Sequence, residues 1–205
     1  LKEKGFATPQ AYEKVSVLFT DFKGFSKIAE HMSEEELVDN LDYCFRAFDH
    51  IIKKNGLEKI KTIGDAYMCA GGIPKPNDSN PLDAVKAAKE MIDFIQDWRS
   101  DKQARGEEAW ELRIGIHTGK VVAGVVGEDK FAYDIWGDAV NTAARMESSG
   151  ESMRINISGD TYEFVKNVLN CEYRGKILAK NKGKIDMYFV NDFIVHHEAG
   201  DTFHT

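Results

Sequence analysis

The chain has 205 residues, and its 27 basic side chains are outnumbered by 34 acidic ones, which gives a formal net charge of −7. Hydrophobic residues make up 42% and charged residues 30% of the chain, which is ordinary for a globular protein, and the length suits one domain with a substantial core. The acidic balance argues against a general nucleic-acid binder, although it leaves room for a nucleotide in a locally basic pocket.

Three further features narrow the class of protein. No apolar stretch approaches the roughly 20 residues needed to cross a bilayer, and no signal peptide opens the chain. The cysteines Cys44, Cys69 and Cys171 have no metal-site spacing and form no even disulfide set, so we expect reduced, buried thiols. The first residue is Leu rather than Met, which suggests a part of a longer protein.

In the first half of the chain, β-rich and helical patterns alternate. We expect an irregular opening over residues 1–13 and a strand over residues 15–20. Ser33 is followed by three glutamates and predicts a helix start, because a capping hydroxyl pairs well with a glutamate three residues later. The helical period continues to a stop at Asn55-Gly56. The next predicted elements are two strands joined by a tight turn and an amphipathic helix, over residues 57–62, 66–70 and 82–99.

In the second half, two β-rich runs flank Thr118-Gly119-Lys120, which predicts a hairpin formed by residues 112–117 and 121–126. A helix fits residues 138–148. The remaining predicted elements are a strand, a helix and two strands, over residues 154–158, 160–168, 171–176 and 185–190. Because strands and helices are interleaved without strict βαβ repetition, the pattern indicates an α+β fold with helices on one face of a sheet.

Two aspartates carry the clearest chemical signal. Asp21 and Asp65 each end a short apolar run close to a glycine, so two adjacent strands would present them side by side. Mg²⁺ commonly takes one or two carboxylates and leaves its other positions to water and phosphate oxygens, so the pair predicts a metal site for a nucleotide phosphate. The structural alternative for either acid alone is a turn residue or a helix cap.

Two further pairs of residues add to this signal. Asn141 and Arg145 are four residues apart on a predicted helix and share a face, where they can hold a polyphosphate and stabilise charge during phosphoryl transfer. The alternative is a surface arginine and a capping-region asparagine. Strand alternation places Lys59 and Lys61 on one face, where Lys61 can donate to a substrate base, and the alternative is a pair of solvated strand lysines.

Four sequence blocks together resemble the catalytic domain of class III nucleotidyl cyclases. They are residues 19–25 (FTDFKGF), 61–68 (KTIGDAYM), 113–119 (RIGIHTG) and 133–146 (YDIWGDAVNTAARM). The blocks occur in that family's order and together extend over most of residues 15–190. The resemblance implies an α+β domain with a ferredoxin-like, palm-type mixed sheet flanked by helices. It outweighs the structural alternatives given above for each motif alone.

The resemblance implies that the two acids bind metal. Asp21 and Asp65 would hold two Mg²⁺ or Mn²⁺ ions, with the backbone carbonyl of Phe22, where the family more often has isoleucine, as a further ligand. One ion would activate the ribose 3′-hydroxyl for attack on the α-phosphorus, and the other would bind the triphosphate and the leaving pyrophosphate. The product would be a 3′,5′-cyclic nucleotide.

The family's other functional groups also have counterparts here. Asn141 would orient the ribose, Arg145 would stabilise charge on the α-phosphoryl group, and Arg113 would contact a phosphate. Lys180 matches a phosphate-binding lysine. An asparagine replaces the first glycine of the family's pattern in that loop, which leaves Lys182 open as the alternative.

The purine-reading positions of the family hold Lys61 and Asp134 in this chain. In the family, enzymes that use ATP carry Lys and Asp there, whereas those that use GTP carry Glu and Cys. A lysine can donate to adenine N1 and a carboxylate can accept from the exocyclic amine, so both residues indicate an adenylyl cyclase with ATP as its substrate. The alternatives are a guanylyl cyclase and a catalytically inactive nucleotide-sensing domain, and the second should have lost a metal acid or Arg145. A diguanylate cyclase or a polymerase palm domain should lack the helix pattern formed by Asn141 and Arg145.

The family's active sites form between two catalytic domains. Because this chain keeps both halves of a site, we expect a head-to-tail homodimer with two equivalent interfacial sites. We expect residues 1–13 to be the remnant of a coupling segment from an upstream regulatory domain, residues 14–192 to be the catalytic domain, and residues 193–205 to be a disordered tail. A cytoplasmic catalytic domain is expected, in a parent protein that is either soluble or membrane-anchored.

Overall fold

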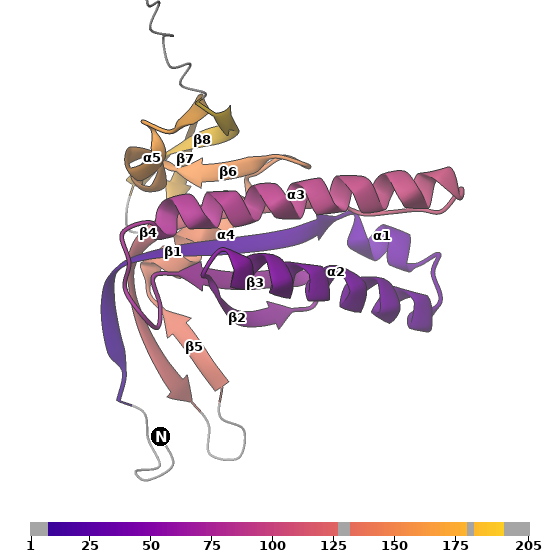
Figure 1. Cartoon of the computed structure of the whole chain (residues 1–205), viewed down its shortest axis with the longest axis horizontal. Coiled ribbons are helices and arrows are strands. Elements are labelled where there is room, and N and C mark those ends of the chain that lie inside the picture. Colours follow the sequence, from indigo (N-terminus) through magenta and orange to yellow (C-terminus); the bar gives the residue numbers. More distant parts are fainter. Residues whose placement is uncertain (1–7, 127–131, 180–182, 195–205) are drawn as a thin grey trace, which may run out of the picture.

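The computed structural model describes residues 8–126, 132–179 and 183–194, which form a mixed sheet flanked by helices (Figure 1). This arrangement confirms the expected α+β fold class. In chain order, the elements are β1 (Gln10–Lys23), α1 (Phe25–Ala29), α2 (Glu34–Lys54), β2 (Glu58–Ile63), β3 (Ala66–Gly71), α3 (Asn80–Ala104), β4 (Glu111–Val126), β5 (Ala132–Trp136), α4 (Asp138–Ser148), β6 (Ile155–Ser158), α5 (Gly159–Val165), β7 (Leu169–Ala179) and β8 (Gly183–Phe193). Residues 1–7 and 195–205, which belong to the expected linker and tail, lie outside the described part of the chain.

The described strands form one sheet in the order β2-β3-β1-β4-β6-β8-β7, and β5 pairs with β4 beside this path. Strand β6 runs parallel to β4, whereas the other neighbouring strands are antiparallel. At the centre, β1 and β4 pair over nearly their whole length, from Gln10 opposite Ala123 to Lys23 opposite Glu111. These two long strands carry three of the candidate site residues, Asp21 and Phe22 on β1 and Arg113 on β4.

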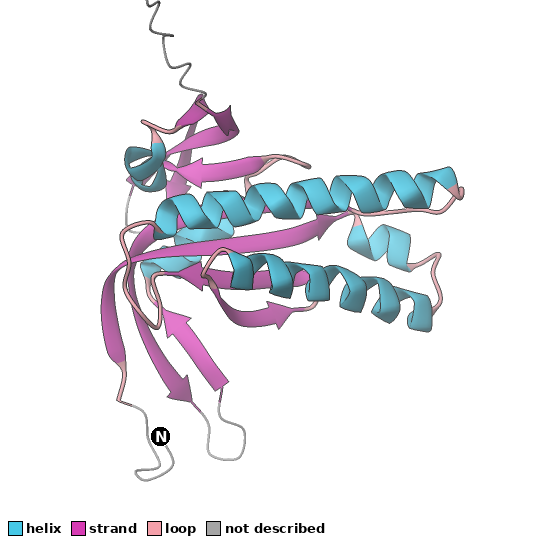
Figure 2. Ribbon diagram, in the orientation of Figure 1, coloured by secondary structure: helices cyan, strands magenta, loops and turns pink. Residues whose placement is uncertain are grey.

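Helices cover both faces of this sheet. On one face, α2 and α3 pack against Leu18 and Phe22 of β1 in the largest apolar cluster of the described residues. On the other face, Ala139 and Ala143 of α4 pack against residues of β1 that include Val17. Figure 2 shows the long helices α2 and α3 in front of the sheet, with α4 behind it. The expectation of helices on a single face is therefore wrong, because alternate residues of β1 point to opposite faces and both sets are apolar.

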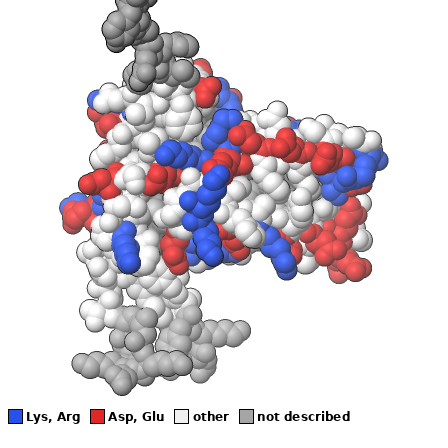
Figure 3. All heavy atoms as spheres, viewed as in Figure 1, with Lys and Arg blue, Asp and Glu red and all other residues white. Residues whose placement is uncertain are grey.

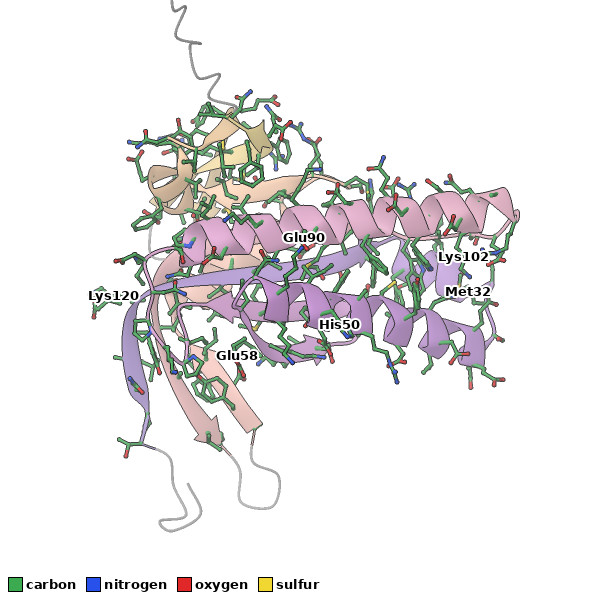
Figure 4. All side chains as sticks on the ribbon, in the orientation of Figure 1. Met32, His50, Glu58, Glu90, Lys102 and Lys120 are labelled. Atoms are coloured by element: carbon green, nitrogen blue, oxygen red, sulfur yellow. The ribbon has the colours of Figure 1, made fainter. Side chains whose placement is uncertain are left out.

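The face formed by α2 and α3 carries charges of both signs, interspersed with one another (Figure 3). Lys54 of α2 and Glu90 of α3 form an ion pair at 3.0 Å, and Lys102 pairs with Glu107 at 2.6 Å. Figure 4 shows Glu90 between the two helices and Lys102 farther along α3. The Lys54–Glu90 pair is typical of a solvated helix surface, whereas Lys102 is buried, at 7% exposure. The candidate site residues gather on the α4 side instead.

Two local helix signals are confirmed. The backbone amide of Glu36 donates to Ser33 Oγ at 3.2 Å, so Ser33 caps α2 as predicted. Helix α4 begins at Asp138 and ends at Ser148, which is the predicted range. None of the helices in the described part of the chain has the length and apolar character needed to cross a membrane.

Strands β1 and β4 are both longer than predicted. Strand β1 starts at Gln10, inside the segment expected to be irregular, because residues 10–12 pair with the far end of β4 after a register shift. The predicted turn Thr118-Gly119-Lys120 lies within β4, where Thr118 pairs with Ser16 and Gly119 pairs with Val15. The ladder with β1 satisfies the backbone groups that a turn would have satisfied, so the hairpin prediction is wrong.

Candidate active site

The structure brings Asp21 and Asp65 together. Asp21 lies near the end of β1, and Asp65 lies in the tight turn between β2 and β3. Strand pairing sets this proximity, because Thr20 of β1 is opposite Tyr67 of β3. Both carboxyl groups are half-buried.

The environment of Asp65 disfavours its charged form. Burial, followed by the neighbouring charge of Asp21, raises the pKa of the Asp65 carboxyl above its usual range. Backbone hydrogen bonds act in the opposite direction. A divalent cation between the two carboxyl groups would offset the unfavourable environment of the Asp65 charge, so the chemistry of these donors fits Mg²⁺ or Mn²⁺. In residues 8–126, 132–179 and 183–194, no group of three or more His, Cys, Asp or Glu side chains is placed to hold a metal ion. Such an ion would take its remaining ligands from backbone, water or substrate oxygens.

Arg113 lies directly beside this pair. It is opposite Asp21 in the β1–β4 register, and its Nη2 donates to Asp21 Oδ2 at 2.8 Å. The Nε of the same guanidinium donates to Glu147 Oε1 at 2.8 Å. Arg113 is thus held between one acid of β1 and one acid of α4, and both hydrogen bonds are charge-assisted.

Glu147 is a site residue that the sequence analysis missed. The residue is buried, at 9% exposure, in the last turn of α4. Burial raises the pKa of its carboxyl, and the charge and hydrogen bond of Arg113 oppose that shift. One sequence signal was available, because Glu147 lies four residues after Ala143 on the apolar stripe of this helix and an acid is unusual there.

Lys61 and Asp134 form an ion pair with 2.5 Å between Lys61 Nζ and Asp134 Oδ2. Lys61 lies on β2 and Asp134 on β5, a strand that the sequence analysis did not assign. The expectation that Lys59 shares a face with Lys61 is wrong. A register shift between the two lysines interrupts the alternation, and Lys59 instead pairs with Asp49 of α2 at 2.8 Å, on the opposite side of the sheet.

Helix α4 carries Asn141 and Arg145. Asn141 is exposed, and Arg145 Nη1 donates to the backbone carbonyl of Leu178 in β7 at 2.9 Å. The helix lies unusually close to β4, because a Cβ added to Gly115 would lie 1.9 Å from the backbone nitrogen of Glu147. Only glycine allows this approach, which fixes the distance between α4 and the strand that carries Arg113.

Of the two remaining predicted site residues, Phe22 belongs to the described part of the chain and Lys180 does not. Phe22 is buried and its ring packs against Trp110 with 5.0 Å between centroids, which anchors the backbone beside Asp21. Lys180 and its alternative Lys182 lie outside the described residues.

Known proteins resemble this chain in both sequence and fold. The model of the family described as the adenylate and guanylate cyclase catalytic domain matches residues 7–192 of the chain. The adenylyl cyclase CyaB from P. aeruginosa has a similar crystal structure, with a TM-score of 0.85 and 31% sequence identity over 91% of this chain and 97% of that one.

Relatives with both substrate types match over most of the chain. Guanylyl cyclase C from Homo sapiens is 40% identical over 195 residues, which are 93% of this chain and 18% of that protein. An adenylate cyclase from Mycobacterium tuberculosis (strain ATCC 25618 / H37Rv) is 39% identical over 179 residues, which are 87% of this chain and 40% of that protein. The chain therefore spans less than half the length of either relative.

Proposed function

Because this chain belongs to the adenylate and guanylate cyclase catalytic domain family, we propose that it is an adenylyl cyclase domain, which converts ATP to 3′,5′-cyclic AMP and pyrophosphate. The observation that carries this choice of substrate is the contact between Lys61 and Asp134. It places one hydrogen-bond donor and one acceptor side by side, on two strands that the fold holds in fixed positions.

The order of donor and acceptor favours adenine. If Asp134 faces the substituent at C6, it accepts from the amine of adenine, and Lys61 donates to the neighbouring N1. Guanine in the same pose would present its O6 acceptor to the carboxylate and its N1–H donor to the ammonium, so both contacts would be mismatched. Buried mismatches of this kind allow large discrimination. A guanylyl cyclase remains the second candidate, because guanylyl cyclase C is among the relatives and a shifted guanine would present O6 to the lysine.

We assign Asp21, Asp65 and the backbone carbonyl of Phe22 to two Mg²⁺ or Mn²⁺ ions. When bound, such ions would activate the ribose 3′-hydroxyl and neutralise charge on the pyrophosphate. Arg113 then supplies a positive charge beside the acids for the phosphates. Lys180 is proposed as a second phosphate contact by resemblance alone.

Asn141 and Arg145 complete the proposed site from α4. Asn141 is exposed and free to orient the ribose, which limits the reaction to one geometry of attack. The Arg145 guanidinium uses one N–H for the Leu178 carbonyl, and its other donors are available for the charge that develops on the α-phosphoryl group.

An uncovered apolar surface supports a homodimer with shared sites. Val122, Val126 and Trp136 are 40%, 59% and 42% exposed, and we call them the β4–β5 apolar strip. Trp136 is opposite Val122, and Asp134 is two residues from Trp136 on the same strand face. A partner that covers the strip would therefore also cover the base-reading side chain, as expected if Lys61 and Asp134 of one protomer complete the site of the other.

The test is product formation from ATP and, separately, from GTP, with Mg²⁺ or Mn²⁺, across a range of protein concentrations. We expect cyclic AMP, with specific activity that rises with concentration as dimers form. Cyclic GMP as the main product would overturn the reading of Lys61 and Asp134. Specific activity that is independent of concentration down to the monomer would overturn the shared site.

A further inference from the structure

We propose that Glu147 is a positioning residue that holds Arg113 at its Nε edge, so that the Nη edge of the guanidinium can exchange Asp21 for a substrate phosphate. This proposal rests on the proposed function for the identity of the phosphate. In this role Glu147 does not contact the substrate. It positions Arg113, which does.

The two acids contact different parts of the guanidinium. Glu147 accepts from Nε and Asp21 accepts from Nη2, both at 2.8 Å. A guanidinium has five N–H donors in one plane, so these contacts leave three free. Without Glu147, the side chain of Arg113 would be held by Asp21 alone, and it would lose its anchor whenever Asp21 turned to a cation.

The two contacts also differ in how firmly their acids are fixed. The backbone of Glu147 is packed against Gly115, which lies two residues from Arg113 on the same strand. The distance between the Glu147 main chain and β4 is therefore set by main-chain packing and not by the ion pair. Asp21 lies instead in the acid pair with Asp65, where a divalent cation would compete with Arg113 for the same carboxylate.

Arg113 thereby acts as an internal counter-ion for Asp21 as long as no cation is bound. Glu147 shares that arginine with Asp21, which weakens the competition that an incoming cation faces. If the Glu147 charge is removed, Arg113 interacts with Asp21 alone, and we expect divalent cations to bind less tightly. The same change replaces the charge-assisted hydrogen bond at the Nε edge with a weaker neutral one, so we expect nucleotide phosphates to bind less tightly as well.

The test compares Glu147→Gln with Glu111→Gln, using the whole chain. Glu111 is a matched control because it pairs with Arg99 at 3.1 Å, lies two residues from Arg113 on β4, and loses the same unit of charge on substitution. Mn²⁺ binding is measured without nucleotide, and binding of 3′-deoxy-ATP, which lacks the attacking hydroxyl, is measured by calorimetry. The KM and kcat for cyclic nucleotide formation and the thermal unfolding midpoint complete the set.

Loss of a charge-assisted hydrogen bond corresponds to roughly a ten-fold change or more in affinity. For Glu147→Gln we expect about that loss for 3′-deoxy-ATP and about that rise in KM, weaker Mn²⁺ binding, and kcat within about three-fold of the parent. Glu111→Gln should leave all four near their parent values. Once Arg113→Gln is present, adding Glu147→Gln should change nucleotide affinity no further, because the positioned group is already gone.

Equal losses in the two glutamate variants would show a long-range charge effect and overturn the proposal, as would additive losses in the double variant. A fall in the unfolding midpoint with unchanged KM would show a purely structural role and would also overturn it. If Glu147→Gln does not fold, Glu147→Asp decides, because it keeps the charge but shortens the reach, and unchanged nucleotide affinity in that variant would refute the positioning role. If the parent chain forms no cyclic nucleotide, the proposed function fails, but Mn²⁺ and 3′-deoxy-ATP binding still test Glu147.

Discussion

Replacement of Gly115 by alanine should be among the most damaging single-methyl additions in the chain. The new Cβ would lie 1.9 Å from the backbone nitrogen of Glu147 and 2.4 Å from both its Cα and the carbonyl carbon of Met146. These are main-chain atoms of α4, so no side-chain rotation can relieve the overlap. Ordinary van der Waals contact begins near 3.4 Å, so α4 and β4 must separate by about 1.5 Å.

This displacement affects both stability and catalysis. Overpacking of this kind typically costs about 1–3 kcal/mol, and because the contact is backbone to backbone we expect a loss at the upper end, about 3 kcal/mol. Helix α4 carries Asn141, Arg145 and Glu147, so the whole group moves away from the acids on β1 and the β2–β3 turn. A misplacement of about 1 Å can cost on the order of 10²-fold in rate, so we expect at least that loss in kcat/KM.

Gly124→Ala is the matched control for the stability effect of this substitution. Gly124 lies on the same strand, and a Cβ there meets nothing closer than the ring of Trp136 at 3.4 Å. The free energy of unfolding is measured by urea titration, and cyclic nucleotide formation is measured well below the unfolding midpoint, so that misplacement is separated from unfolding. If Gly115→Ala matched Gly124→Ala within about 0.5 kcal/mol, the close approach of α4 to β4 would not exist in solution.

Four other perturbations test the proposed chemistry. Arg145→Ala should lower kcat about 10²–10³-fold with little change in stability, since it removes one oriented group that stabilises the transition state; near-normal kcat would refute that role. Equimolar Asp65→Ala and Asn141→Ala chains, each inactive alone, should recover about a quarter of the parent activity when mixed, because half of the random dimers would carry one intact site of two. No recovery would count against shared sites. Lys61→Glu combined with Asp134→Cys should move the product ratio from cyclic AMP toward cyclic GMP by at least about ten-fold, and an unchanged ratio would remove the base-reading assignment. Chelation of divalent cations should abolish turnover, with recovery on addition of Mn²⁺, and activity that survives chelation would contradict the metal assignment.

Elements with strong local signals were predictable from the sequence alone. The capping serine at Ser33 and the helix from Asp138 to Ser148 need only a few neighbouring residues to be recognised, and both are present in the structure. The positions of Asp21 and Asp65 near strand ends were predictable too, because an apolar run that ends at an acid near a glycine is also a local pattern. Their proximity follows from strand pairing that the pattern only suggests.

Features set by tertiary pairing were not predictable in this way. Thr118-Gly119-Lys120 has the composition of a turn, yet β1 extends far enough to pair with it and keep β4 continuous. Strand β5 is short, and its pattern is merged with the helix that follows. The direction of Lys59 depends on a bulge that alternation cannot reveal.

Glu147 shows the limit of motif reasoning most clearly. Its place on the apolar stripe of α4 is the one local signal, and that signal does not identify the partner of the carboxylate. Its significance comes from the approach of α4 to Gly115, which buries the carboxylate against an arginine from a strand more than thirty residues away in sequence.

The continuity of β4 has a mechanical consequence for a dimeric enzyme. One strand of 16 residues carries Arg113 near its start and, through its pairing with β5, supports Asp134 near its end. In the proposed dimer these two ends belong to different active sites. A nucleotide whose base is bound at one site therefore contacts the same strand that positions Arg113, the proposed phosphate-binding arginine, at the other site. Nucleotide binding at the first site can thus change the rigidity or orientation of β4 at the second site. This strand gives the two sites a direct physical route to cooperativity that needs no loop movement.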